Sequence, residues 1–179
     1  MRRNLDNVPR FHELMKEQAD ISANDGLDWR MFIMRAYGVD VPENIARCPT
    51  IANLIQDRPD VMSCALSFIA PGKHVPKHRG PFRGILRFHL ILAMPRTPSG
   101  DVAAVLEIDG KPYRLNDGDC LLWDDTFPHE VWNRSEEVRI ALLLDVWRRE
   151  MPYDMELLSR LVVSMVRLGM KWTGVRYTG

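Results

Sequence analysis

The feature of this sequence that most constrains its fold is a succession of short apolar or alternating segments, separated by turn-forming residues, from about residue 61 onward. Each segment is short enough for a strand, and the turns contain pairs such as Pro71-Gly72 and Asp109-Gly110. Many short strands at close spacing are typical of an antiparallel sandwich, barrel or jelly roll, and not of alternating strands and helices. We therefore predict a mainly β fold with strands within 61–70, 85–94, 102–108, 111–115, 120–123, 130–133 and 139–147.

Helical patterns flank this β-rich region on both sides. From Arg10 to about Tyr37, the apolar residues predict two short amphipathic helices with a break near Asn24-Asp25-Gly26. After Pro152, apolar residues at helical spacing predict a helix that docks on the sheet or on a second subunit, as in a homo-oligomer. A helix lying on a membrane surface is the alternative. The apolar residues of this helix are Leu157, Leu158, Leu161, Val162, Met165, Val166 and Met170.

Charge and cysteine content limit the classes of partner and compartment. The chain has 179 residues with 24 Lys+Arg and 24 Asp+Glu, so its net charge of +0 argues against nonspecific nucleic-acid binding. Of the 24 basic residues 19 are arginine, which clamps carboxylates well, so we expect an anionic small-molecule ligand. Cys48, Cys64 and Cys120 form no CxxC pair, and no signal peptide or long apolar span is recognisable. We expect a soluble, cytoplasmic protein without a transmembrane segment.

Two of the five histidines occupy positions typical of metal ligands in a β fold. His78 lies in the turn segment PGKHVPKHRGP, and His129 lies in WDDTFPHEVW at the start of a predicted strand. Imidazoles from separated β-segments can meet at one rim of a jelly roll, and neutral imidazole suits Fe, Zn, Cu and Ni. The two-histidine, one-carboxylate sites of Fe(II) oxygenases usually place the acid two residues after the first histidine, but that position is Gly80 here. We expect His74, in a Pro-flanked turn, to be structural or to lie near the mouth of the site, and not to be a third metal ligand.

Polar side chains share one face of each of two predicted strands. In 85–94, alternation places Arg87 and His89 on one face and a continuous apolar row on the other, which we expect to be buried. Apolar residues bracket the polar pair, which favours a polar cavity over bulk solvent. In 139–147, Arg139 points away from an apolar row, and only Asp145 shares its face as an acid. Because a buried arginine needs an anion, we expect one from outside the chain.

Three segments together resemble a known family. The segments SFIAPGKHVPKHRGPFRGILRFHL, GDCLLWDDTFPHEVWN and RIALLLDVW, within 67–147, are similar to the aspartyl/asparaginyl β-hydroxylases, including the glycine at position 80. The resemblance implies a double-stranded β-helix, that is, a cupin-like jelly roll, with Fe(II) and 2-oxoglutarate as cofactors. Together with the chain length and the helical patterns, this predicts one domain over 1–179, with a helical flank (1–60), a jelly-roll core (61–150) and a C-terminal helix (151–179).

The resemblance assigns the metal ligands and one neighbouring acid. His78 and His129 match the two iron ligands of the family. Asp125 matches an acidic residue near the metal, although the alternative that Asp124-Asp125 caps a turn stays open.

The resemblance also assigns the co-substrate contacts. Arg139 matches the arginine that pairs with the distal carboxylate of 2-oxoglutarate, and Ser67 matches a hydroxyl at the same end. Arg87 and His89 match an Arg-x-His pair beside the co-substrate and substrate carboxylates, and Arg87 is counted among the catalytic residues with the two iron ligands.

The function implied by this resemblance is hydroxylation of an unactivated carbon, with O2, in an amino-acid-like small molecule or a short peptide. A cupin-like module that binds a metal and a 2-oxoacid without turnover is an alternative. A metal-free β-domain with incidental histidines is a third possibility, and it predicts that the protein retains no iron.

Overall fold

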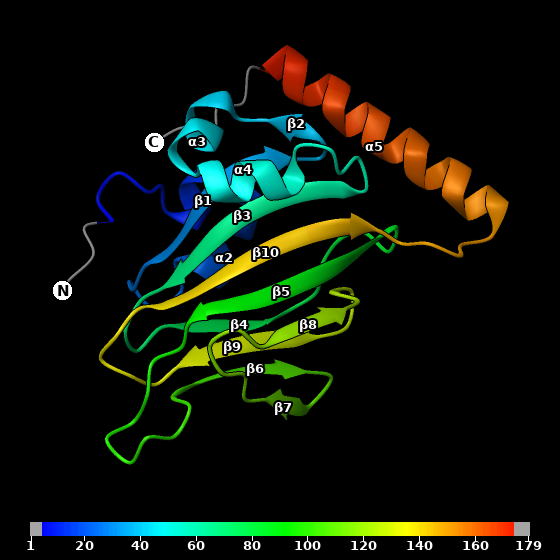
Figure 1. The fold of residues 1–179 in the computed structure, drawn as a ribbon. Helices are drawn as coiled ribbons and strands as arrows, with labels where there is room; N and C mark the ends of the chain where they lie inside the picture. The colour runs from blue at the N-terminus through cyan, green and yellow to red at the C-terminus, as the bar shows by residue number, and fades with distance from the viewer. Residues whose placement is uncertain (1–4, 174–179) are drawn as a thin grey trace.

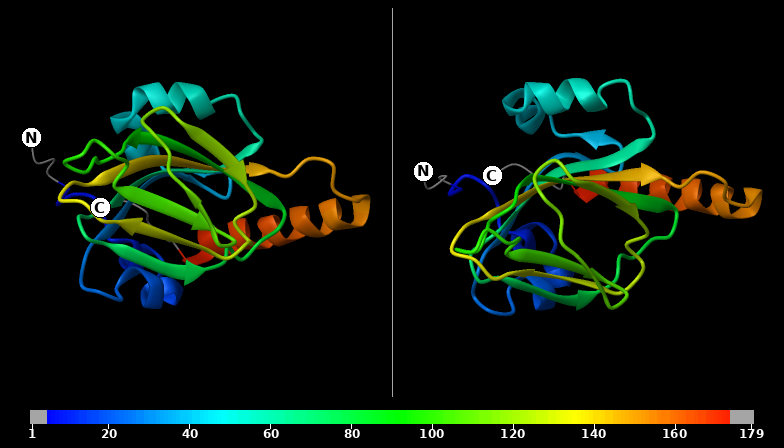
Figure 2. Two further views of the ribbon diagram at one scale, coloured as in Figure 1. Left: turned by 90° about the horizontal axis from the view of Figure 1, so that it is seen from below. Right: turned by 60° about the horizontal axis from the view of Figure 1, so that its bottom comes forward.

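The structure, a computed structural model, describes residues 5–173 and contains two antiparallel β-sheets (Figure 1). The two sheets face each other across an apolar layer (Figure 2). The larger sheet has six strands and the smaller has four, so the prediction of a mainly β jelly roll is confirmed. The larger sheet runs in the order β2 (Val39–Asp40), β1 (Trp29–Ala36), β3 (Val61–Ile69), β10 (Arg139–Trp147), β5 (Ile85–Ala93) and β8 (Cys120–Trp123). The smaller sheet runs β4 (His74–His78), β9 (His129–Asn133), β6 (Ala104–Ile108) and β7 (Lys111–Tyr113).

The pairing register of the strands determines which side chains meet between the sheets. In the smaller sheet β4 pairs with β9, and His78 lies directly opposite His129. In the larger sheet β10 lies between β3 and β5, and Asp145 is opposite Arg87 on β5. Because side chains alternate along a strand, a one-residue slip in any of these pairings would turn the polar groups to the other face.

The space between the two sheets is apolar apart from one polar region. Ile69 of the larger sheet packs with Val75, Leu106 and Val131 of the smaller sheet, and all four are buried. The outer side of the larger sheet carries a second apolar cluster, which packs beneath the short helices α3 (Pro42–Arg47) and α4 (Pro49–Ile55). Figure 2 shows these two helices on that outer side.

The outer apolar row of β5 departs from the prediction that it is buried. Leu86, Phe88 and Leu90 line an open groove of about 600 Å³ between β5, β10 and α4. Beside it, Leu92 and Leu122 are 44% and 54% exposed. The prediction of full burial was wrong because α3 and α4 cover only the β1 and β3 side of this sheet.

The N-terminal flank is helical only in part. The first predicted helix is present as the short elements α1 (Phe11–Leu14), η1 (Lys16–Gln18) and α2 (Ala19–Ser22). The second predicted helix was wrong, because 29–36 forms strand β1, paired with β3. This segment has large apolar side chains on both faces, and a strand between the two apolar layers buries both of them.

The C-terminal helix is present as α5 (Tyr153–Thr173), which extends beyond the sheets along one side (Figure 2). Val163 is 2% exposed and packs with Met62 and Ile85 at the end of the larger sheet. The expectation that this helix docks on the sheet is therefore confirmed for one of its faces. No helix within residues 5–173 combines the length and the apolar character needed to cross a membrane.

Candidate functional site

Two histidine side chains meet at the end of the smaller sheet where β4 ends and β9 begins. The ring centroids of His78 and His129 are 4.1 Å apart. The Nδ1 of His78 lies 2.7 Å from the carbonyl oxygen of Pro76, and the Nδ1 of His129 lies 2.9 Å from that of Phe127. Since a carbonyl only accepts hydrogen bonds, Nδ1 is the donor in each ring, and each Nε2 keeps a free lone pair. This is the tautomer that a metal-binding histidine uses.

The protein environment keeps both rings uncharged. Burial lowers the pKa of His78 and lowers the pKa of His129 to about 3, the latter with a further contribution from His78. Both imidazoles are therefore neutral at neutral pH, as metal ligation requires.

The position two residues after His78 has no room for a side chain. A Cβ built on Gly80 would lie 2.3 Å from the carboxyl carbon of Asp125, and the amide of Gly80 donates to the backbone carbonyl of Asp125 at 2.7 Å. The carboxyl group of Asp125 thus fills the space that an acidic side chain at position 80 would need. Within residues 5–173 no group of three His, Cys, Asp or Glu side chains is placed to hold a metal ion.

The two neighbouring aspartates have different roles. Asp124 accepts hydrogen bonds from the amide and the hydroxyl of Thr126, at 3.0 and 2.6 Å, and so caps the turn. Asp125 is 2% exposed and its Oδ2 lies 3.2 Å from a guanidinium nitrogen of Arg87, while its Oδ1 has no hydrogen-bond partner in the described chain. Burial raises the pKa of Asp125, and the Arg87 charge opposes that shift. Asp124 is therefore the residue that caps the turn, and Asp125 is a buried acid beside Arg87.

Behind the histidines lies a small buried cavity with an unbalanced cation. The cavity has a volume of about 40 Å³ and is lined by His78, His129, Arg139, His89 and Ser67 among others. Arg139 is 2% exposed and donates to Nε2 of His89 at 2.7 Å. Burial lowers the pKa of Arg139 to about 10.

Two donors of this pair are unused. The Nε of Arg139 and the Nδ1 of His89 have no hydrogen-bond partner within the described residues. Because Nε2 of His89 accepts from Arg139, its Nδ1 carries the proton, and burial with the Arg139 charge lowers the pKa of His89 well below its ordinary value. A buried cation beside an unused neutral donor matches an anion that accepts hydrogen bonds.

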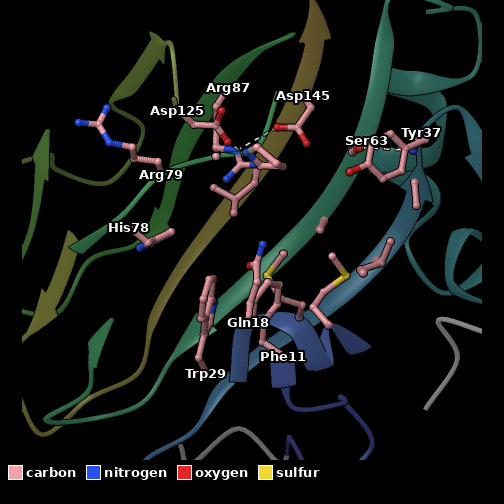
Figure 3. Close-up of a pocket in the computed structure, with 18 of the residues that line it drawn as sticks. Phe11, Gln18, Trp29, Tyr37, Ser63, His78, Arg79, Arg87, Asp125 and Asp145 are labelled. Carbon is pink, nitrogen blue, oxygen red and sulfur yellow. Dashed lines mark hydrogen bonds and ion pairs between the residues drawn. The ribbon is translucent and has the colours of Figure 1, made fainter. Parts of the chain in front are cut away.

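Arg87 lies on the boundary between this cavity and a larger pocket. Its Nε donates to Oδ1 of Asp145 at 2.9 Å, and it contacts Asp125 on its other side (Figure 3). Asp145, the one acid on the same face of β10 as Arg139, therefore pairs with Arg87. Arg139 keeps no carboxylate partner in the described chain.

The larger pocket lies on the other side of the histidine pair. It has a volume of about 150 Å³, and Figure 3 shows Arg87, Asp125 and Asp145 at one end, with Trp29 and Phe11 at the other. Most of the remaining lining is apolar, although Gln18, Arg35 and Ser63 also line the pocket. The apolar residues are Met15, Met31, Ile33, Ala36, Ala65 and Leu143.

Residues of the N-terminal segment form part of both cavities, and the sequence did not indicate this. Trp29 lines both, stacks on Phe11 at 4.0 Å and donates from its indole nitrogen to the hydroxyl of Ser67 at 3.0 Å. No local signal marks this strand, because 29–36 has large apolar side chains on both faces and its pairing with β3 forms only in the folded chain. The structure brings together all six predicted site residues, Ser67, His78, Arg87, His89, His129 and Arg139. His74 pairs with Glu130 outside the site.

Comparison with known proteins gives a family and several relatives. The model of the family described as aspartyl/asparaginyl beta-hydroxylase matches residues 1–149. An ornithine lipid ester-linked acyl 2-hydroxylase of Rhizobium tropici is 33% identical over 138 residues, which are 77% of this chain and 47% of that protein. The human aspartyl/asparaginyl beta-hydroxylase is 28% identical over 129 residues, 69% of this chain and 16% of that protein. The chain thus spans less than half the length of these relatives.

Among solved structures, a predicted oxalate decarboxylase of Thermotoga maritima is similar with a TM-score of 0.43 and 16% identity, over 68% of this chain and 82% of that one. The family match spans most of the chain and includes every residue of the histidine site. The chain belongs to the aspartyl/asparaginyl β-hydroxylase family.

Proposed function

We propose that this chain is an Fe(II)- and 2-oxoglutarate-dependent hydroxylase that acts, with O2, on an unactivated carbon of an amino-acid-like or small peptide substrate. One observation carries the proposal. Two neutral histidines with free Nε2 lone pairs border a buried cavity in which Arg139 and His89 have unused donors. The hydroxylase names of the relatives and the family support the same reaction class.

The residues present fit an iron centre with two protein ligands. His78 and His129 would hold Fe(II) through Nε2, and the backbone carbonyls of Pro76 and Phe127 fix the orientation of the rings. Asp125 lies in the same region, with its carboxyl group beside Gly80 and in contact with Arg87, and it is not counted as a third ligand. Such a set leaves several coordination positions for co-substrate and oxygen.

The inner cavity fits the distal carboxylate of 2-oxoglutarate. Arg139 and His89 would donate to it, and Ser67 lines the same cavity. Iron and 2-oxoglutarate, if bound together here, would supply with O2 the oxidant for the C–H bond, one oxygen atom going to succinate as CO2 leaves and the other to the hydroxylated product. The chain itself orients the co-substrate, holds Asp125 through Arg87 and excludes water from the buried end.

The larger pocket supports an amphipathic substrate. Its charged end at Arg87, Asp125 and Asp145 suits a polar, amino-acid-like group, and its wall of methionine, isoleucine, alanine and leucine side chains suits an aliphatic chain. The relative that is named an acyl 2-hydroxylase is consistent with such a substrate. We propose that the reacting carbon lies in, or next to, the apolar part of an N-acylated or otherwise alkyl-bearing amino acid.

Succinate formation tests this function. Free amino acids, their N-acyl derivatives and short peptides would be incubated with the protein, Fe(II), 2-oxoglutarate and O2. We expect succinate in proportion to hydroxylated product with at least one N-acyl derivative. His129→Ala should abolish it, and His74→Ala, outside the site, should not. If 2-oxoglutarate binds but no substrate raises succinate above the His129→Ala background, the chain is a binding module instead.

A further inference from the structure

The indole N–H of Trp123 is a buried donor that has no acceptor in the described chain. Within residues 5–173 four buried side-chain atoms lack a hydrogen-bond partner, and three of them belong to residues that line the inner cavity. These three atoms are Nε of Arg139, Nδ1 of His89 and Nε1 of Trp123. The Trp123 donor takes no part in the function proposed above, and a buried N–H without an acceptor is costly.

Strand pairing places this indole on the same face of the larger sheet as the other donors. Trp123 ends β8, the edge strand, and its register partner on β5 is Arg87. Side chains of directly paired residues point to the same face, and His89, two residues along β5 from Arg87, shares it. The indole packs on the buried cluster around Ile69, and its ring is nearly perpendicular to that of His129, with centroids 4.7 Å apart. Trp123 therefore forms part of the cavity wall beside a proposed iron ligand.

The number of donors around this cavity matches a carboxylate group. The hydroxyl of Ser67 accepts from the indole of Trp29 at 3.0 Å, so its own proton can serve as a fourth donor. The two oxygens of a carboxylate have about four lone-pair positions, whereas the oxygen of a carboxamide is accompanied by an NH2 group that is itself a donor. The buried charge of Arg139 adds to the preference for an anion.

We propose that Trp123 is a third N–H donor to the distal carboxylate of 2-oxoglutarate, and that it helps to select 2-oxoacids that carry a carboxylate at the far end. This inference rests on the function proposed above and adds a residue to its co-substrate site. The contact is a hydrogen bond, so its effect belongs to affinity and to discrimination between 2-oxoacids.

Anaerobic calorimetry with Fe(II) and two 2-oxoacids tests this contact. 2-Oxohexanoate keeps the iron-chelating end of 2-oxoglutarate, but it has an ethyl group in place of the distal carboxylate. Trp123→Phe keeps an aromatic ring and removes the N–H, so the affinity for 2-oxoglutarate should fall about tenfold. The affinity for 2-oxohexanoate, measured at millimolar concentrations, should change by less than about threefold. A change in the shape of the cavity would weaken both ligands alike.

The matched control is Trp132→Phe. Trp132 stacks on His74 outside the site, so its replacement should change neither affinity. Circular dichroism of both variants verifies that they are folded.

The indole N–H signal of the wild-type protein gives a second measurement. With Zn(II) in place of Fe(II) the protein is diamagnetic, and each of the five tryptophans contributes one indole signal to a heteronuclear NMR spectrum. The Trp123 signal is identified by its loss in Trp123→Phe or, if that variant does not fold, by elimination with the other four Trp→Phe variants. We expect it to move downfield when 2-oxoglutarate is added, because the N–H gains a charged acceptor.

The results that would overturn the inference differ from those that would overturn the proposed function. An affinity for 2-oxoglutarate within about threefold of wild type in Trp123→Phe, or equal losses for both 2-oxoacids, would remove Trp123 from the co-substrate site and leave the function standing. An unmoved Trp123 signal in protein saturated with 2-oxoglutarate would do the same. A wild-type protein that binds neither 2-oxoacid would overturn both.

Discussion

Two backbone carbonyl groups determine which nitrogen of each site histidine faces the cavity. Each ring donates to the carbonyl two residues earlier in the chain, at Pro76 and Phe127. The resulting orientation is local and does not depend on a third side chain. The residue two positions after His78 is therefore not needed to orient the ring. That residue is Gly80, and the carboxyl group of Asp125 fills the space beside it.

The first prediction concerns the close approach of Gly80 and Asp125. Gly80→Ala places a methyl group 2.3 Å from the Asp125 carboxyl, so we expect it to reduce the free energy of unfolding by about 1 to 3 kcal/mol. Asp125→Ala removes the obstructing atoms. The double variant should therefore be more stable, by at least about 1 kcal/mol, than the sum of the two single changes implies. Urea unfolding of the four proteins measures this coupling, and simple additivity would contradict the account.

The second prediction concerns the buried arginine. Arg139→Gln removes the charge proposed to bind the distal carboxylate, so the affinity for 2-oxoglutarate should fall by roughly 10- to 100-fold. Anaerobic calorimetry in the presence of Fe(II) gives the dissociation constants. Arg96→Gln is the control, since Arg96 bonds Gly100 and Asn116 at the surface. A loss of less than about threefold in Arg139→Gln would assign the co-substrate carboxylate to another group.

At the residue scale, much of the candidate site could be predicted from the sequence. Alternation along a strand put Arg87 and His89 on one face, and the structure places both at the cavities. The pairing of Arg87 with Asp145 could not be predicted, because it joins β5 to β10 and depends on register. Trp29 was missed for a similar reason, since its strand was interpreted as a helix.

At the scale of elements, the N-terminal segment shows that tertiary packing can override the secondary structure suggested by a local sequence pattern. The segment 29–36 carries large apolar side chains on both faces, a composition that suits a helix as well as a buried strand. Pairing with β3 decides between them, and no local signal reports it. The preceding elements α1, η1 and α2 are each too short to be stable alone.

The third prediction concerns the residue that fixes this segment. Lys73 is fully buried, and its ammonium donates to the carbonyl of Ser22 and to the side chains of Asn24 and Asp25 at 2.6 to 3.0 Å. Lys73→Met leaves these acceptors without their donor, so it should lower the free energy of unfolding by about 1 to 3 kcal/mol.

The matched control for that change is Lys77→Met. Lys77 is 58% exposed and lies 3.6 to 3.8 Å from two glutamates. Its loss should cost less than about 1 kcal/mol, as for surface ion pairs in general. Equal effects of the two substitutions in urea unfolding would show that Lys73 does not anchor the N-terminal segment.

At the scale of the whole molecule, the jelly roll itself was predictable, and the coverage of its outer surface was not. Short alternating segments and turn residues determine two facing sheets. The positions of α3 and α4 over the larger sheet depend on tertiary packing and not on the alternation pattern. These helices leave the groove at Leu86, Phe88 and Leu90 open. The alternation pattern is the same for a covered and an uncovered apolar row.

The fourth prediction concerns the pH dependence of stability in the metal-free protein. Burial holds the pKa of His89, His78 and His129 below the value near 6.5 of an unfolded chain. Below that pH the unfolded state binds more protons than the folded state, so the free energy of unfolding should fall as the pH decreases from about 6.5. Above it these groups contribute no slope.

His89→Asn tests the assignment, because asparagine can still accept a hydrogen bond from Arg139 and does not titrate. Urea unfolding at several pH values between about 7 and 5 should give a shallower slope in this variant, by up to about 1.4 kcal/mol per pH unit. An unchanged slope would mean that His89 is protonated in the folded protein.

The most direct test of the central claim is the visible absorption of the anaerobic protein with Fe(II) and 2-oxoglutarate. Chelation of iron by the 2-oxoacid in a site held by His78 and His129 should give a weak charge-transfer band. We expect the band in the wild type and in His74→Ala, whose histidine pairs with Glu130 outside the site, and its loss in His78→Ala and His129→Ala. An undiminished band in either of these two variants would contradict a shared iron centre.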